Sequence, residues 1–120
     1  METSVTIGWV LSVLSVITLF VGGTLNILRK PIAIKDMEQV GYPPDILVQF
    51  GVMNILIGAA TLIPATSFIG VILATGWMGG TIAAHVRIKD KFVIQTIIPI
   101  LIWIGFGLRH PLEMHSLLGF

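Results

Sequence analysis

Charged residues in this chain are confined to a few short segments, and long uncharged apolar stretches separate these segments. Seven Lys and Arg and six Asp and Glu side chains make up 11% of the 120 residues, whereas about 25% is usual in a soluble domain. Apolar residues make up 55% of the chain. A domain of this length buries only about 60–70% of the surface that its unfolded chain exposes. The sequence therefore excludes a soluble monomer and predicts an integral membrane protein.

Four apolar stretches approach the length of about 20 residues that a helix needs to cross a bilayer. Arg29 ends the first, Pro44 suits the first turn of the second, the basic segment 87–91 ends the third, and Pro99 is expected to kink the fourth. A signal peptide is the competing interpretation of the first stretch, but its apolar part is too long and no basic residue precedes it. We expect an all-α, four-helix transmembrane bundle with short loops, in which residues 1–120 form a single membrane domain. The expected spans are 5–28, 45–63, 68–86 and 92–108.

The segment 29–45 between the first two spans is longer than a simple turn and has two interpretations. Ile34, Met37 and Val40 recur at helical spacing between charged neighbours, which is typical of a short helix lying at the membrane interface. An irregular solvated loop is the alternative, and the sequence leaves both open.

Lys and Arg residues are unevenly divided between the expected loops. Three lie in the loop 29–45 and three in the loop 87–91, but only Arg109 lies on the opposite side. Because basic residues concentrate in cytoplasmic loops, we expect these two loops in the cytoplasm and both termini outside a cell inner membrane. The formal charge of +1 includes no basic stripe, so nucleic acid is not expected as a partner.

Small residues recur four positions apart along several spans, a pattern typical of helix contacts inside membranes. Gly22 lies on the first span, Gly58 on the second, and Gly76, Gly80 and Ala84 on the third. Tight packing within the bundle is one interpretation, and association with a partner protein or as a homo-oligomer would use the same contacts. The other interpretation is that glycines thin the helices and leave a slot for a flat ligand.

Polar side chains within the spans gather in the half near the basic loops. Such groups are costly inside a bilayer and usually face the bundle interior or a cavity. Asn54 is the deepest, about 13 Å from the start of its helix, and the two mid-span tryptophans either wall a cavity or fill the core. We therefore predict a polar pocket that opens toward the cytoplasmic side. Its candidate ligand-binding residues are Asn26, Gln49, Asn54, Trp77, His85 and Trp103.

No pattern of catalytic residues is present in the sequence. His85, the one ionisable residue near the membrane interior, either contacts a ligand or caps its helix. His110 and His115 are five positions apart, a poor match to helical metal spacing, so no metal site is expected. The absence of cysteine excludes thiolate nucleophiles and Cys-bound iron–sulfur clusters. We expect no catalytic residues in this chain, and an oxidoreductase subunit built from it would take its electron carrier from a partner.

Two segments are more specific than general hydrophobicity: the turn Gly41-Tyr42-Pro43, and the exit Ala84-His85-x-Arg87-x-x-Asp90 of the third span. Together with their neighbours they give the chain an order of features that resembles the DoxX-like family of small four-span membrane proteins. One departure is Asn54, which stands where family members often carry a glutamate, so a proton-dependent role for that carboxylate does not transfer here. The segments that carry the resemblance are 26–31, 40–44, 51–64, 84–90 and 103–111.

The resemblance implies a four-helix bundle and a range of functions. Some relatives are subunits of thiosulfate:quinone oxidoreductase, others accompany redox-defence proteins, and others assist membrane-protein assembly. A quinone, with a flat head and an apolar tail, would fit the predicted pocket. We interpret the chain as a non-catalytic subunit or binding module for a quinone-like or lipid-like molecule or a partner protein, linked to membrane redox or sulfur metabolism. A structural assembly factor is the alternative, and a proton-coupled exporter is disfavoured because no span contains a membrane-embedded carboxylate.

Overall fold

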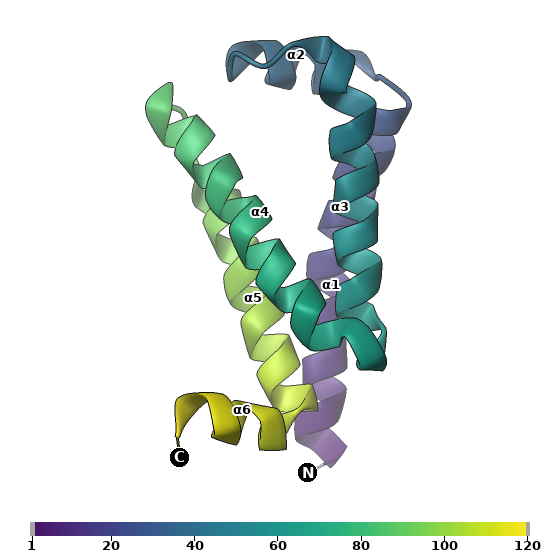
Figure 1. Cartoon of the computed structure of the whole chain (residues 1–120), viewed down its shortest axis with the longest axis vertical. Coiled ribbons are helices and arrows are strands. Elements are labelled where there is room, and N and C mark those ends of the chain that lie inside the picture. Colours follow the sequence, from purple (N-terminus) through teal and green to yellow (C-terminus); the bar gives the residue numbers. More distant parts are fainter. Residues whose placement is uncertain (1, 120) are drawn as a thin grey trace.

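The computed structural model describes residues 2–119, and in this range the regular elements are all helices. Four long helices, α1 (Glu2–Ile27), α3 (Leu47–Leu62), α4 (Ser67–Arg87) and α5 (Val93–Arg109), alternate in direction (Figure 1). The two ends of the chain consequently lie at the same end of the molecule. The all-α bundle predicted from the sequence is confirmed.

Two shorter helices lie across the ends of the bundle. Helix α2 (Pro31–Gln39) covers one end, and α6 (Pro111–Leu118) crosses the other (Figure 1). The segment after the first span is therefore a helix, which settles the alternative that the sequence left open. Below, the end with α2 is called the α2 end, and the end with both chain termini is called the terminal end.

Prolines mark where several helices begin. Pro31 starts α2 and Pro111 starts α6. Pro44 and Pro64 open the short 3-10 turns η1 (Pro44–Ile46) and η2 (Pro64–Thr66), which lead into α3 and α4. Proline suits these positions because its fixed φ is already helical and the first turn leaves its N–H groups without intrahelical partners.

Within the described residues 2–119, three helical segments are long and apolar enough to cross a membrane, by length and composition: Thr3–Ile27, Pro44–Leu62 and Pro64–Arg87. Helix α5 has 17 residues and continues through Pro99. It counts as part of a fourth span only together with α6, and the two are bent by 112° at the break between them. The fourth predicted span is thus the shortest, and the chain turns sharply where it ends.

The bundle is arranged as a ring in which α1 packs against α3 and α5, and α4 packs against the same two helices. Helices α3 and α4 meet near the terminal end and diverge toward the α2 end (Figure 1). Val71, Ala74, Ile102 and Phe106 belong to the buried core of this ring. The core therefore lies where the helix pair α1 and α3 is still in contact with the helix pair α4 and α5.

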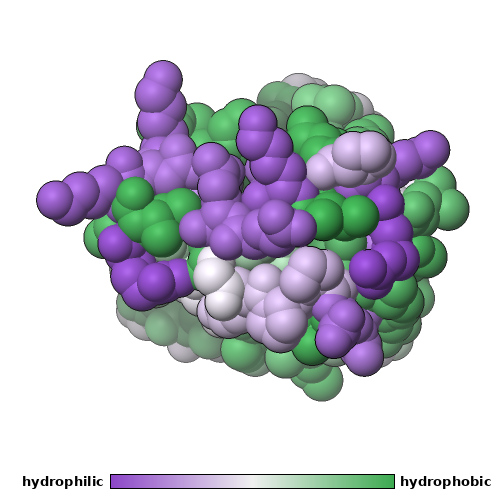
Figure 2. All heavy atoms as spheres, turned by 90° about the horizontal axis from the view of Figure 1, so that it is seen from above, coloured by the Kyte–Doolittle hydropathy of each residue, from purple (hydrophilic) through white to green (hydrophobic). Residues whose placement is uncertain are grey.

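Polar and apolar side chains are separated on the surface in the way expected of a membrane protein. Figure 2 looks onto the α2 end, where polar side chains gather over the end while apolar side chains cover the flanks. Six of the seven Lys and Arg residues lie at this end, in α2, in the adjacent loops or, as Arg87, at the last residue of α4. Large apolar side chains on the flanks are exposed, for example Leu56 at 57%. An apolar belt beside a polar end identifies an integral membrane protein.

Candidate functional site

A pocket of about 550 Å³ lies beneath α2, where the two helix pairs diverge. This volume lies within the range of small-molecule sites, about 300–1,000 Å³. Residues from α1, α2, α3, α4 and α5 line it. Most of its walls are apolar. Two clusters of polar groups lie on different helices, and further polar side chains also line the pocket: Thr18, Asn26, Asp36 and Tyr42.

The first polar cluster joins α3 to α4. The indole Nε1 of Trp77 donates a hydrogen bond to Oδ1 of Asn54, and the edge of the Phe50 ring packs on Trp77 with 5.1 Å between ring centroids. Asn54 Nδ2 is a donor in no side-chain hydrogen bond recorded for residues 2–119, and it points toward Gly22. Asn54 thus keeps amide donors for a hydrogen-bond acceptor inside the pocket.

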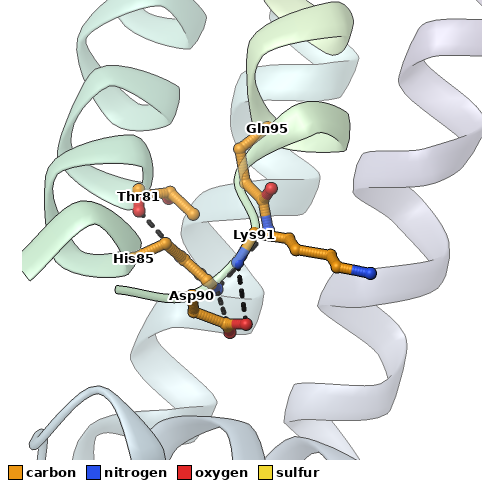
Figure 3. A network of polar contacts seen from close by, with 5 residues as sticks. All are labelled: Thr81, His85, Asp90, Lys91 and Gln95. Atoms are coloured by element: carbon orange, nitrogen blue, oxygen red, sulfur yellow. Dashed lines mark hydrogen bonds and ion pairs between the residues drawn. The ribbon is translucent and has the colours of Figure 1, made fainter. Parts of the chain in front are cut away.

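The second polar cluster lies at the α2 end of α4 and α5 (Figure 3). His85 Nδ1 lies 2.8 Å from the carbonyl oxygen of Thr81. Because a carbonyl only accepts, Nδ1 carries the proton and Nε2 is the acceptor of the neutral ring. That Nε2 faces Gln95 Nε2 at 3.5 Å and Asp90 Oδ2 at 4.0 Å. His85 can therefore accept a hydrogen bond from a ligand when neutral, or pair with Asp90 when protonated.

The carboxylate of Asp90 is held by the backbone. Its Oδ1 accepts a hydrogen bond of 2.8 Å from the Lys91 N–H, which leaves Oδ2 turned toward His85 (Figure 3). Asp90 follows α4 in the short loop before α5. In the sequence, Asp90 stands out only as part of the motif at the exit of the third span, because nothing in the sequence indicates that a loop carboxylate three residues beyond a helix turns back toward it.

Helix α2 forms a fixed roof over the pocket. Its buried residues Ala33 and Met37 line the cavity and pack with Leu47 of α3. Arg87 Nη2 donates a hydrogen bond to the carbonyl oxygen of Val40, which ties the segment after α2 to the end of α4. Sequence reasoning missed this contact, since it joins residues 47 positions apart.

Four of the six candidate ligand-binding residues line the pocket, and Gln49 does not. Gln49 is exposed, and its amide nitrogen, in the orientation that satisfies both amide atoms, donates to the carbonyl oxygens of Asp45 at 3.2 Å and Ile46 at 3.3 Å. Gln49 lies five positions before Asn54, which is about 140° around the helix. The sequence-based expectation for Gln49 is corrected for this reason. The four residues that do line the pocket are Asn26, Asn54, Trp77 and His85.

Trp103 is the second correction, because it lies between α4 and α5 outside the pocket. Its Nε1 donates to Thr75 Oγ1 at 2.7 Å, and its ring packs on the edge of Phe106 with 6.1 Å between centroids. Trp103 thus fills space between helices, whereas Trp77 forms part of the cavity wall.

The small residues on α1 and α3 differ in how closely they pack. A Cβ on Gly58 would lie 2.8 Å from Cε1 of Phe20, so this glycine permits α1 and α3 to approach. A Cβ on Gly22 would lie at an ordinary 3.6 Å from Asn54 Nδ2, and Gly22 lines the pocket.

The small residues on α4 differ from the expected helix packing. A Cβ on Gly76 or Gly80 would meet no atom within 4 Å. Both glycines line the pocket, as does Ala84. Their position is explained by the divergence of α4 from α3 at this level, which removes the neighbour that a packing stripe would need (Figure 1).

Within residues 2–119, no three His, Cys, Asp or Glu side chains are grouped so that they could hold a metal ion. The pocket therefore offers hydrogen-bonding groups on apolar walls. Such an arrangement can orient a flat, lipophilic molecule.

Comparison with known proteins identifies the family. A model of the DoxX-like family matches residues 10–106, a range that contains the pocket and nearly all of the four long helices. The resemblance seen in the sequence is confirmed. Searches of curated proteins and of solved structures found no match.

Proposed function

The chain belongs to the DoxX-like family, and from its pocket we propose that it is a non-catalytic membrane subunit that binds a quinone-like molecule. The observation that carries this proposal is the cavity of about 550 Å³ with polar groups on otherwise apolar walls. A flat head with carbonyl acceptors and an apolar tail matches those walls. The proposal concerns binding and assigns no reaction to the chain.

The hydrogen-bonding groups are placed on helices that do not touch each other. Asn54 projects from α3 and Gln95 from α5, and these helices lie diagonally across the ring. A head with an acceptor at each side would be held from two directions, by the Asn54 amide and by the Gln95 amide beside His85. This favours a quinone-like head over a molecule with a single polar end.

The apolar part of the ligand would lie against the deeper walls of the pocket. Leu19, Met78 and Ile98 are buried core residues that also line the cavity. Contact with such side chains stabilises an alkyl chain by roughly 0.8 kcal/mol for each methylene removed from water. The ligand class is therefore one that already resides in membranes.

We propose a membrane redox protein as the partner of this subunit. The chain contains no cysteine, and His85 is the only histidine that lines the pocket. A bound quinone would then exchange electrons with a cofactor on another protein. A lipid in the pocket, or a role in the assembly of membrane proteins, is the alternative that the experiments below separate from this one.

We further propose that the α2 end faces the cytoplasm of a cell that carries the protein in its inner membrane. Six of seven Lys and Arg residues lie at that end, as the positive-inside rule requires. Single cysteines at Thr66 and Lys91 test this, because both positions are exposed, lie at opposite ends, and compete with no native cysteine. A membrane-impermeant thiol reagent should label Thr66→Cys in intact cells and leave Lys91→Cys unlabelled. The reverse pattern contradicts the proposed orientation.

Quenching of tryptophan fluorescence tests the binding proposal directly. The chain has three tryptophans, and only Trp77 lines the pocket. A W9F/W103F variant leaves Trp77 as the reporter, and a W77F/W103F variant leaves Trp9 at the terminal end as the control. A benzoquinone with a decyl tail, added to protein in phosphatidylcholine vesicles, should quench Trp77 saturably and Trp9 only in proportion to its concentration. Equal quenching of both tryptophans contradicts a bound quinone.

Native mass spectrometry of the protein extracted from its own membranes separates the alternatives. A retained quinone at stoichiometric amount supports the proposal. A retained phospholipid in place of a quinone supports a lipid-binding module. A stable protein partner without a small molecule favours the assembly role.

A further inference from the structure

Gly76 and Gly80 belong to two surfaces of the molecule at once. Both line the pocket, and both are exposed. Gly76 is two positions from Ala74 and from Met78, and Gly80 is two positions from Met78, which is about 200° around the helix in each case. Ala74 and Met78 are buried in the core, so the two glycines lie on the side of α4 that faces away from it. A pocket that reaches this side is open through the flank of the bundle.

The opening lies at a depth where the flank meets acyl chains. Gly80 and Gly76 lie seven and eleven residues before Arg87, the last residue of α4, or about 11 and 17 Å along the helix. The hydrocarbon core of a bilayer is about 30 Å thick. Ile72 and Leu73, on the next turn, are exposed apolar residues of the same flank. A molecule that reaches this opening must therefore be dissolved in the membrane.

Neighbouring groups leave the flank open and cover the end. A Cβ on Gly76 or Gly80 would meet nothing within 4 Å. At the α2 end, by contrast, the buried residues Met37 and Val40 line the pocket from above. Arg87 holds the carbonyl of Val40 there. Passage across the roof would require this contact to break, whereas passage through the flank would not.

Trp77 lies at the inner edge of the opening. It stands between the two glycines in the sequence, and its indole is held by the hydrogen bond to Asn54 and by the edge contact with Phe50. Both partners belong to α3. An incoming molecule would therefore meet the Trp77 ring before it reaches the Asn54 amide.

We propose that the ligand enters sideways from the bilayer, between α3 and α4, through an opening whose width depends on Gly76 and Gly80. This inference rests on the proposed function, since it describes how a quinone-like molecule reaches the same pocket. Side chains larger than hydrogen at these two positions narrow the opening and slow both binding and release. The equilibrium between the membrane and the pocket then changes much less than the rates.

Gly79 provides a matched control for this proposal. It is exposed, and a Cβ on it would meet nothing within 4 Å, but it does not line the pocket. The test compares Gly76→Leu, Gly80→Leu and Gly79→Leu in the W9F/W103F background. All three replacements have space around them and exchange glycine for a better helix former, so the variants are expected to fold. Circular dichroism of each variant verifies this.

Stopped-flow quenching gives the rates. Vesicles that contain the protein are mixed with vesicles that contain decyl-benzoquinone, and release is followed by adding an excess of empty vesicles. Gly76→Leu and Gly80→Leu should slow the pocket-specific phase of binding and of release by about tenfold, which corresponds to about 1.4 kcal/mol in the barrier. Gly79→Leu should retain the rates of the parent protein.

The outcomes separate the route from the site. Absence of saturable quenching in the parent protein overturns the proposed function, and the route with it. Saturable quenching with equal rates in all three leucine variants overturns the route alone and leaves the site intact. Weaker equilibrium quenching with an unchanged release rate also overturns the route, because the leucines would then fill the pocket without narrowing its opening.

Discussion

The two ends of the bundle differ in how the same helices meet. At the terminal end, a Cβ on Gly70 would overlap the backbone nitrogen of Thr61. Six and ten residues further along α4, a Cβ on Gly76 or Gly80 would meet nothing within 4 Å. The same residue type thus permits the closest helix contact at one end and leaves an opening at the other. The spacing of small residues in a membrane helix therefore does not show whether they form a close helix contact or line an opening.

Arg109 accounts for much of the closure at the terminal end. It is only 8% exposed, and its Nη2 donates to the Thr61 carbonyl at 2.9 Å and to Ser67 Oγ at 2.5 Å. Its guanidinium also lies 4.3 Å from the ring centroid of Trp9. One side chain of α5 thereby contacts α1, α3 and the start of α4. In contrast, the polar groups at the α2 end face a cavity. They are therefore available for hydrogen bonds to a ligand.

Gly70→Leu should disrupt the packing of the terminal end and lower the free energy of unfolding more than the other variants. Its side chain would extend into the backbone of Thr61 and Ala60. Overpacking typically costs about 1–3 kcal/mol and occasionally more, and we expect a loss at the upper end because the obstructing atoms belong to the backbone. Gly79→Leu, with open space around it, should leave the free energy of unfolding unchanged or slightly higher. Denaturation in mixed detergent micelles measures both. A similar stability of the two variants would show that the terminal end is not closely packed.

Ser67→Ala should weaken the closed end by the next largest amount. Ser67 Oγ accepts from Arg109 and donates to the Thr61 carbonyl at 2.7 Å. Hydrogen bonds to a charged group contribute about 1.5–3 kcal/mol, so the free energy of unfolding should fall by about that amount. Thr66→Ala is the control, because Thr66 is exposed and its hydroxyl bonds only to nearby carbonyls. If both substitutions lowered the free energy of unfolding equally, the hydrogen bond between Arg109 and Ser67 would not be the cause of the loss.

Asn54→Leu should affect the open end through ligand affinity. It removes the free amide donor in the pocket, and a neutral hydrogen bond contributes about 1 kcal/mol net, so decyl-benzoquinone should bind about fivefold more weakly. Gln49→Leu also replaces an amide side chain by leucine on the same helix, but outside the pocket, and should leave affinity unchanged. Quenching of Trp77 gives both dissociation constants. If Gln49→Leu weakened binding as much, the pocket would not be the site.

The contrast between the two ends also explains what the sequence could predict. Helix positions followed from apolar length and from prolines, which act locally, so the bundle was predicted correctly. The family was predicted correctly from the resemblance of the segments 41–43 and 84–90. Asn26, Asn54, Trp77 and His85 were placed at the pocket because polar side chains in the same half of several spans must meet somewhere inside. Gln49 and Trp103 lie outside the pocket, contrary to the expectation, because the depth of a residue in the membrane does not determine the direction in which its side chain points.

Long-range contacts were the part that the sequence could not supply. Arg109 was predicted only as a lone basic residue on the outer side, yet it is buried against Ser67, Thr61 and Trp9, which lie 42, 48 and 100 positions away in the sequence. Likewise, no local pattern indicates that α4 diverges from α3, so the sequence could not distinguish Gly76 as an opening from Gly70 as a contact. Both distinctions arise from the angle between helices, which the whole bundle determines.

The smallest expected effect concerns acid sensitivity at the closed end. Burial lowers the pKa of His110 from its usual value, and the nearby charge of Arg109 lowers it further, while Glu113 opposes both. The half-buried ring stacks on Phe106 with 4.8 Å between centroids. Because the folded state disfavours the protonated ring, His110 makes no contribution at a pH above its unfolded pKa of about 6.5. As the pH falls from there through the lowered pKa of the folded protein, stability is lost.

His110→Phe should remove this contribution and keep the stacked ring. The unfolding midpoint of the parent protein should therefore fall more between about pH 7.5 and about pH 5 than that of the variant, with the difference confined to the range below about pH 6.5. Thermal denaturation in detergent at several pH values measures the difference. The change should not alter quinone affinity, because His110 lies at the end opposite the pocket. If acid weakened both proteins equally, the acid sensitivity would not arise from His110.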